Sequence, residues 1–386
     1  MRRSSKLIIV LLFIITSFVA GTLIGYLGTH RVGYYISNQT NVHNLIRLIA
    51  ENVSSIRGLK FSTPPEAVLI DSSTALSTWG DEVPKDALIL NDVFKMTLLS
   101  DLSYDVTESF RKLIGLWLAA SSGNTIYVVH DLLNVNDPLT YRVLAHELTH
   151  VLQNQHFKLP TPRTLDEALA IKSLVEGDAD LTADIYVGLL NLSNLSKVTK
   201  IQPEDPYIAI QLAPYVFGEE FVRYLYDIGG WGLVNNAYVV VPKSMKYIMF
   251  PEKYIINEPI ETIDLPRPME CDILYEGALG PAYIYVLISR YLNESLALKL
   301  SSDWLGDKVI YYVCNESKEL MWIIKLASNE GAANLYNLLN EIAVTMGGRR
   351  YDDYLHIDGP GNLLKVSIQV ERNLIKLHSK LLSNPK

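Results

Sequence analysis

The pentapeptide His146-Glu147-Leu148-Thr149-His150 constrains this chain more than any other stretch. Residues four apart lie one above the other on a helix, so His146 and His150 can direct two imidazoles toward one point. Imidazole suits Zn²⁺, and a catalytic zinc takes three protein ligands and leaves one position for water. Glu147 follows the first histidine and is placed to move a proton from that water. The pattern predicts a helix that carries two zinc ligands and a general base.

The flanks of the pentapeptide fit a helix. Asp137 is a favoured N-cap residue, and Pro138 suits the first helical position because its missing N–H is not needed there. The apolar stripe that this helix should bury consists of Leu144, Leu148, Val151 and Leu152. The alternative is a buried helix in which two histidines and a glutamate coincide by chance.

A second helix is expected to supply the third ligand. Thr164 and Glu167 have the spacing of a capping box, which marks its start. Glu176 and Asp180 stand one turn apart in the run Glu-Gly-Asp-Ala-Asp and therefore share a face. Glu176 is predicted as the third ligand of one zinc ion per chain. Asp180 is predicted to accept a hydrogen bond from the far nitrogen of a liganding histidine.

The other residues of this run are expected to have structural roles. Gly177 and Ala179 are small and would let the second helix approach the first closely. Asp178 and Asp184 are expected on a solvated face of the helix, because an unpaired buried carboxylate is costly.

The two motifs together resemble the gluzincin group of zinc metallopeptidases, in the thermolysin-like arrangement of H-E-x-x-H and E-x-x-x-D. The resemblance implies that His146, His150 and Glu176 bind zinc. It further implies that Glu147 is the general base and that Asp180 orients His146. Gluzincins also supply a Tyr or His beside the metal to hold the oxyanion. The candidates here are Tyr215, Tyr224, Tyr238 and Tyr254, and Tyr215 is the preferred one.

A closer resemblance is to a group of largely uncharacterised prokaryotic zincin-like proteins with LxEGDA and PYxxGxxFV motifs. It covers roughly residues 40–345. Besides the zinc motifs, the matching segments are IRGL (56–59), PYVFGEEFV (214–222), GGW (229–231), VNNAY (234–238), PEKY (251–254) and WLGD (304–307).

The N-terminus reads as a membrane anchor. Basic residues within positions 1–6 precede an apolar run over 7–27, which is long enough to cross a bilayer. The positive charges predict a cytoplasmic N-terminus and an extracellular catalytic domain, in a single-pass protein of the cell membrane. A cleaved signal peptide and a secreted protein are the alternative. Outside the cell, Cys271 and Cys314 could form a disulfide.

The expected fold class is α+β, with an N-terminal transmembrane helix and a small β-sheet that leads into a mainly helical, zincin-like catalytic body. After the anchor, we expect a stalk or first helix over 33–60 and a zincin-like subdomain over 61–200. A helical C-terminal subdomain over 201–345 and a tail over 346–386 should follow. In zincins the edge strand of the sheet pairs with an extended substrate, and Ile126–Val129 or its hairpin partner is assigned that role.

The sequence therefore predicts a membrane-anchored zinc metallopeptidase that acts on a peptide or protein substrate. A net charge of −8 and the lack of a basic patch argue against a nucleic-acid partner. Two other classes compete with this interpretation. One is a zinc-binding, catalytically inactive surface protein, and the other is a structural protein of the cell envelope with an accidental motif.

Overall fold

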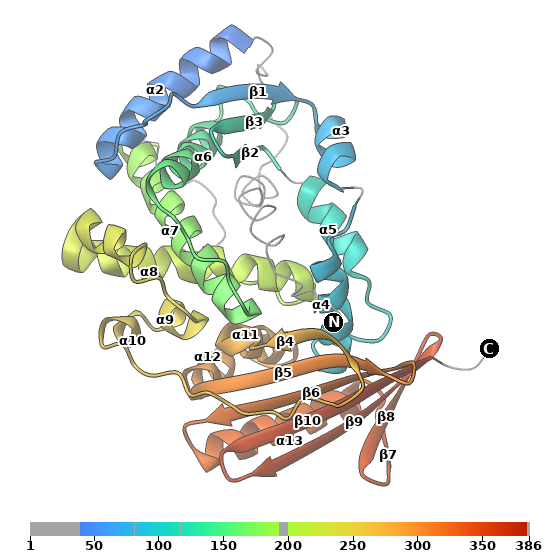
Figure 1. Cartoon of the computed structure of the whole chain (residues 1–386). Coiled ribbons are helices and arrows are strands. Elements are labelled where there is room, and N and C mark those ends of the chain that lie inside the picture. The colour runs from blue at the N-terminus through green and yellow to red at the C-terminus, as the bar shows by residue number, and fades with distance from the viewer. Residues whose placement is uncertain (1–38, 81, 116, 193–199, 384–386) are drawn as a thin grey trace.

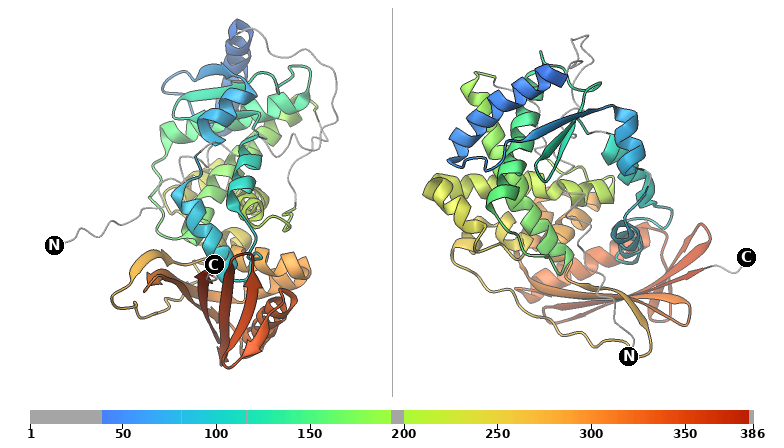
Figure 2. Two further views of the ribbon diagram at one scale, coloured as in Figure 1. Left: turned by 90° about the vertical axis from the view of Figure 1, so that its right-hand side faces the viewer. Right: turned by 45° about the horizontal axis from the view of Figure 1, so that its top comes forward.

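The computed structural model describes residues 39–80, 82–115, 117–192 and 200–383. A three-stranded sheet lies at one end of the molecule, long helices fill the middle, and a seven-stranded sheet lies at the other end (Figure 1). The two views of Figure 2 show the larger sheet below the helices as a separate layer. The candidate zinc ligands fall on the helices between the two sheets.

The N-terminal part contains the small sheet. Its elements are α2 (Gln39–Arg57), β1 (Glu66–Ile70), α3 (Ser72–Ala75), the π-helical turn η2 (Leu76–Gly80), α4 (Lys85–Met96), α5 (Val106–Gly115), β2 (Ala119–Ser122) and β3 (Thr125–Val129). The strand order is β1-β3-β2, with β1 parallel and β2 antiparallel to β3. Helix α2 confirms the helix expected within 33–60, since Val42, Ile46, Ile49 and Val53 form its buried stripe.

Three long helices form the middle layer: α6 (Pro138–His156), α7 (Leu165–Leu189) and α8 (Pro206–Ala237). The predicted starts of the first two are confirmed. Asp137 accepts a hydrogen bond from the Leu139 N–H at 2.9 Å, and Thr164 accepts one from the Glu167 N–H at 3.1 Å. The Glu167 carboxylate bonds back to the N–H of Arg163, so the capping box closes one residue earlier than its usual pattern.

The start of α8 has the same signal as the start of α6. Asp205 is the N-cap and Pro206 the first helical residue, while a second proline, Pro214, lies inside the helix. Near its far end the helix is kinked at Gly230, whose φ of 57° is a conformation that favours glycine.

Two glycines allow α7 and α8 to touch backbone to backbone. A Cβ on Gly177 would lie 2.0 Å from the carbonyl oxygen of Gly218, and a Cβ on Gly218 would lie 2.2 Å from that of Ser173. Both distances are far below any van der Waals contact. Gly177 therefore serves close packing against α8, and not against α6 as predicted.

The C-terminal half corrects the predicted fold class. Its elements are α9 (Met245–Met249), α10 (Pro251–Ile255), β4 (Asp272–Gly277), α11 (Gly280–Tyr291), α12 (Glu294–Ser302), β5 (Trp304–Cys314), β6 (Ser317–Leu326), α13 (Asn329–Thr345), β7 (Arg349–Tyr351), β8 (Tyr354–Gly359), β9 (Asn362–Glu371) and β10 (Leu374–Ser383). The seven strands pair in the order β4-β5-β6-β10-β9-β8-β7, and every pairing is antiparallel.

The expected mainly helical body with a tail over 346–386 is wrong, because β7 to β10 belong to this sheet. The pairing of β10 with β6 joins strands β4 to β6 to strands β7 to β10 in one sheet, and it brings Leu377 opposite Trp322. Alternation within one strand does not show such a distant partner, so the sequence pattern missed the sheet. Helix α13 packs across the face that buries Trp322 and Leu377.

The predicted membrane anchor also needs correction. In the part of the chain that the structure describes, no helix is both long and apolar enough to cross a bilayer. This finding gives no support to the expected transmembrane helix or to the single-pass location built on it. The positions that carried the prediction, 1–6 and 7–27, lie outside the described residues.

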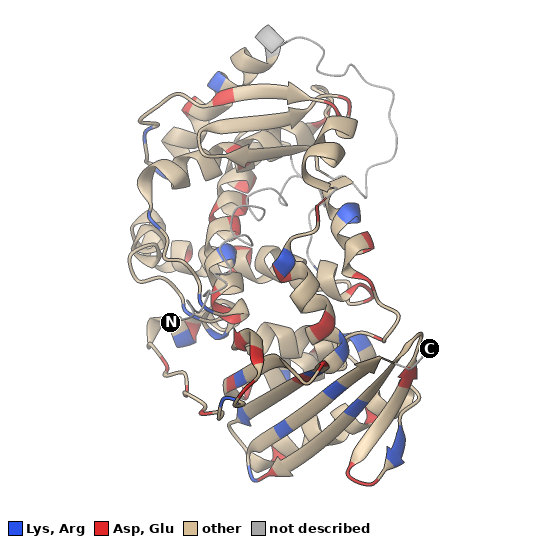
Figure 3. Cartoon of the chain, turned by 45° about the vertical axis from the view of Figure 1, so that its right-hand side comes forward, with Lys and Arg blue, Asp and Glu red and all other residues tan. Residues whose placement is uncertain are grey.

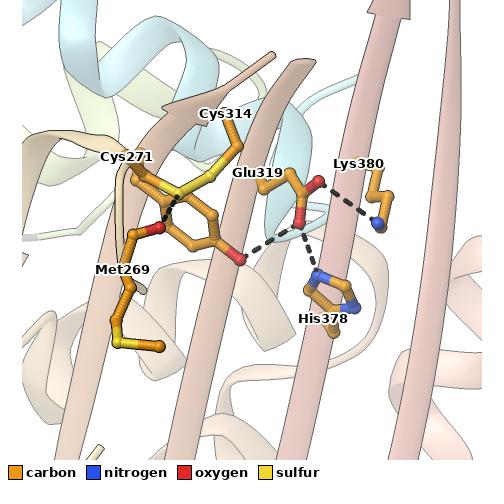
Figure 4. The surroundings of a disulfide bond; sticks show 7 residues. Met269, Cys271, Cys314, Glu319, His378 and Lys380 are labelled. Atoms are coloured by element: carbon orange, nitrogen blue, oxygen red, sulfur yellow. Dashed lines mark hydrogen bonds and ion pairs between the residues drawn. A yellow bond between two sulfur atoms is a disulfide. The ribbon is translucent and has the colours of Figure 1, made fainter. Parts of the chain in front are cut away.

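A disulfide joins Cys271, just before the edge strand β4, to Cys314 at the end of β5, with a Cα–Cα distance of 4.8 Å. Figure 4 shows this bond at the edge of the large sheet. Beside it, Glu319 accepts hydrogen bonds from Tyr312 and His378 and pairs with Lys380 at 3.1 Å. Side chains of both charges thus lie on this sheet, and Figure 3 shows how the two charges are distributed over the described residues.

Substituting Gly218 by alanine should destabilise the protein by roughly 3 kcal/mol or more, because the added methyl meets backbone that cannot move without separating the helices. Urea denaturation of the full chain measures this change. Gly188→Ala is the matched control. Gly188 lies exposed near the end of α7 with open space around it, so alanine there should be neutral or stabilising. Equal effects of the two substitutions would contradict the tight contact.

Candidate metal centre

His146 and His150 of α6 meet Glu176 of α7 inside the helical layer, and all three side chains are buried. The two Nε2 atoms are 3.0 Å apart, and they lie 3.2 Å and 3.3 Å from Oε2 of the glutamate. Ligands about 2.0 to 2.1 Å from a tetrahedral zinc are separated by ~3.3 Å. The three atoms are therefore spaced as one face of such a tetrahedron, and this group could hold a metal ion.

Both imidazoles are held with Nε2 turned toward the glutamate. Nδ1 of His146 lies 3.0 Å from Oδ1 of Asp180, and Nδ1 of His150 lies 2.8 Å from Oε1 of Gln153. Each acceptor holds the proton on Nδ1, which leaves Nε2 free for a metal. The structure brings Asp180 to the position expected from the sequence. Gln153 was missed, although its place three residues after His150 puts it on the same helix face.

Arg142 is the second residue that the sequence interpretation missed. It is buried on α6, four residues before His146, and donates to Asp180 at 2.9 Å and to Asp184 at 2.8 Å. Burial by itself would raise the pKa of Asp180, but the charges and hydrogen bonds of Arg142 and His146 together outweigh it and hold that pKa well below its usual range. Asp180 therefore stays ionised and keeps its hold on His146.

Asp178 is completely buried, so its predicted place on a solvated face is wrong. It forms a 2.7 Å ion pair with Arg57 at the end of α2. It also accepts hydrogen bonds from the Tyr238 hydroxyl at 2.8 Å and from Nε2 of Gln153 at 3.0 Å. The carboxylate thus fixes Gln153, which in turn orients His150. The charge is tolerated inside the protein because it is paired and hydrogen-bonded.

Three of the segments that carry the zincin-like resemblance converge on this carboxylate. Arg57 comes from the IRGL segment, stacks over Trp231 of the GGW segment at 4.1 Å, and donates to Asn235 of the VNNAY segment at 2.8 Å. Tyr238 closes the same segment and binds Asp178 directly. These motifs therefore have a structural account: they join α2, α7 and the end of α8 behind the metal centre.

The charges of the centre favour binding of a cation. Burial opposes the ionised form of Glu176, yet the two neighbouring imidazoles lower its pKa to about 2. Burial likewise opposes protonation of His146, but Asp180 and Glu176 raise its pKa to about 10. The proton on His146 thus supplies the positive charge that a bound metal ion would otherwise supply.

Glu147 faces the centre from α6 with no exposed surface. Neither of its carboxylate oxygens makes a well-directed hydrogen bond to a described residue. The hydroxyl of Ser121 on β2 lies close enough to lower its pKa slightly. Burial raises the pKa of Glu147 to about 7, against the opposing charges of His150 and His146. A buried carboxylate without a partner is costly, so its retention suits a group that acts on a ligand.

Tyr215 is the one of the four candidate tyrosines that reaches the centre. It is buried on α8, and its hydroxyl lacks a well-directed partner within the described chain. Burial raises its pKa well above the usual value, and the adjacent charge of Glu176 adds to this. The other candidates are held elsewhere: Tyr238 binds Asp178, Tyr254 donates to the carbonyl of Val240, and Tyr224 is partly exposed.

Comparisons with known proteins leave the family open. No protein-family model matches the chain, and no curated protein matches it. One solved structure, from Chloroflexus aurantiacus and described provisionally as a hydrolase with a novel fold, aligns with a TM-score of 0.37 at 14% sequence identity. The alignment covers 65% of this chain and 98% of that one. A similarity at this level does not establish a common fold.

The full chain should bind one zinc ion, and Glu176→Gln should weaken binding by roughly 100-fold, because an amide is a poorer zinc ligand than a carboxylate. Zinc content after gel filtration and competition with a chelating dye measure both. Glu51→Gln, on the exposed side of α2, is the control. Binding should tighten as the pH rises from about 6 toward 10, because the metal must displace the proton on His146, whose pKa is about 10. Equal zinc content in parent and Glu176→Gln would contradict the three-ligand centre.

Asp178→Asn should destabilise the fold by about 3 to 5 kcal/mol, because it leaves the buried guanidinium of Arg57 without its counter-charge. Urea denaturation of the full chain measures the loss. Combining the change with Arg57→Met removes the stranded charge and should recover part of the stability. If Asp178→Asn alone costs less than about 1 kcal/mol, the ion pair of Arg57 and Asp178 does not hold α2 to α7.

Proposed function

We propose that this protein is a zinc-dependent hydrolase of the metallopeptidase class that cleaves peptide bonds in a peptide or protein substrate. The observation that carries the proposal is the buried, unpartnered carboxylate of Glu147 beside three converging ligand atoms. A merely structural metal site is closed by a fourth protein ligand and needs no such group. The described residues offer two histidines and one glutamate, which is the ligand set of a catalytic site.

Zinc bound to His146, His150 and Glu176 would supply a Lewis acid for the substrate carbonyl and lower the pKa of a water molecule. Glu147 has the complementary task of accepting the proton of the attacking water and giving it to the leaving amine. Its pKa near 7 suits both directions of transfer. Asp180 and Gln153 hold the orientation of the two imidazoles through their Nδ1 atoms and take no part in the proton transfer.

Tyr215 is suited to stabilise the oxyanion that develops on the attacked carbonyl. Its hydroxyl is a buried donor without a described partner, beside the ligand Glu176. Its raised pKa keeps the proton on the phenol, so the group can donate a hydrogen bond at neutral pH. A donor held in a site without bulk water stabilises developing charge more than the same donor in solution.

The small sheet offers one edge strand near Glu147. In the order β1-β3-β2, the strand Thr125–Val129 is central, so Ile126–Val129 cannot pair with a substrate. Its hairpin partner, Ala119–Ser122, lies at the edge and carries Ser121 close to the Glu147 carboxylate. An extended substrate could add to this edge by main-chain hydrogen bonds, which places its backbone beside the general base.

Glu147→Gln should reduce the hydrolysis of a casein or fluorogenic peptide substrate by roughly 1,000-fold or more and leave zinc binding intact, since an amide cannot accept the proton. Steady-state kinetics with zinc content measured on the same samples tests this. Glu252→Gln, an exposed change on α10, should keep full activity. A zinc-loaded parent that hydrolyses no peptide, or a Glu147→Gln variant with undiminished activity, would refute the proposal.

A further inference from the structure

Lys172 is a buried cation next to the metal centre that the proposed chemistry does not use. It lies on α7 one turn before Glu176, and its exposed fraction is only 4%. Its Nζ donates to Oε1 of Gln211 at 3.1 Å. Within the described residues it makes no ion pair, whereas the other fully buried lysine, Lys246, lies 2.6 Å from Glu258.

An ammonium group in such a place is costly. Taking a charge from water into the interior requires a compensating partner, and a neutral amide oxygen supplies only part of it. Burial lowers the pKa of Lys172 to about 8, and the charge of Glu176 counteracts this only in part. The group therefore remains available to an anion.

The opposite wall of this cluster offers a donor without an acceptor. Gln211 and Tyr215 stand one turn apart on α8, and the ammonium of Lys172 lies 5.2 Å from the centre of the tyrosine ring. Nε2 of Gln211 is buried and forms no well-directed hydrogen bond with a described residue, while the hydroxyl of Tyr215 lies beside Glu176. The ammonium of Lys172 and the amide N–H of Gln211 are thus two adjacent buried donors.

We propose that Lys172, together with Gln211, binds a carboxylate of the substrate, so that the centre prefers peptides that carry a carboxylate close to the scissile bond. This inference rests on the proposed peptide hydrolysis and names the substrate class of that site. A carboxylate has two oxygens with about four lone-pair sites, which can accept from both the ammonium and the amide N–H. Its charge would also compensate the buried cation.

Two sources of the carboxylate have the same chemistry: the C-terminus of the substrate and an acidic side chain next to the scissile bond. A C-terminal carboxylate would make the protein an exopeptidase that removes C-terminal residues. An acidic side chain would make it an endopeptidase with acidic specificity. Both use the same two donors, and the substrates below separate them.

The test compares three N-blocked peptides on the zinc-loaded full chain: one with a free C-terminus, its C-terminal amide, and an amide with aspartate next to the scissile bond. The parent should hydrolyse the free acid or the aspartyl peptide at least tenfold faster, in kcat/KM, than the plain amide. Lys172→Met, which keeps length but removes charge, should abolish this preference and change hydrolysis of the plain amide less than twofold. Lys158→Met, an exposed change beyond α6, is the matched control.

Equal hydrolysis of all three peptides by the parent would overturn the inference, and so would an equal loss on all three in Lys172→Met. Thermal melting shows whether that variant is folded. If the variant is not folded, Lys172→Arg replaces it. Arginine retains the positive charge, so the preference for the peptides with a carboxylate should be preserved. Loss of this preference in Lys172→Arg would count against the inference.

A binding measurement separates this inference from the proposed reaction. Calorimetry with N-acetylphenylalanine and with its amide, on the full chain with and without zinc, needs no turnover. The free acid should bind at least tenfold more tightly than the amide, and Lys172→Met should remove the difference. If no peptide is hydrolysed but this difference is present, the hydrolase proposal fails and the carboxylate site stands. Equal binding of acid and amide overturns the site.

Discussion

The contact between α6 and α7 is the interaction on which the rest of the structure depends. The helices run in opposite directions, since Arg142 of α6 meets Asp184 late in α7 while Gln153 meets Val175 earlier in it. Between these ends, His146 and His150 face the carboxylate of Glu176. Nearly every buried charge here has an opposite charge or a hydrogen bond, which is what allows polar helix faces to pack inside a protein.

The surrounding elements hold this helix pair in place by two different means. On one side, glycine lets the backbone of α8 touch that of α7, which carries Tyr215 and Gln211 to the metal centre. On the other side, Asp178 binds Arg57 and Tyr238 and so connects the first helix and the end of α8 to the same point. The metal centre is thus built from segments far apart in the chain. Its geometry is set by the pairing of charges more than by apolar contact alone.

Local signals in the sequence predicted the helices and the ligands well. His146 and His150 have helical spacing, as do Glu176 and Asp180, and the capping residues Asp137 and Thr164 mark where α6 and α7 begin. Signals that depend on distant partners failed. The seven-stranded sheet requires β10 to pair with β6, and the burial of Asp178 requires an arginine far earlier in the chain. Neither partner can be read from the spacing of neighbouring residues.

The sequence by itself determined which residues could share a helix face: the two imidazoles on one helix and two acids, Glu176 and Asp180, on the next. The tertiary structure decided which of those faces are buried and what compensates them. It made Asp178 an interior charge, excluded the central strand as an edge, and brought Lys172 beside Glu176 and Tyr215. The reason is physical. Periodicity follows from the geometry of one helix, whereas the free energy of a buried charge depends on groups that only folding brings together.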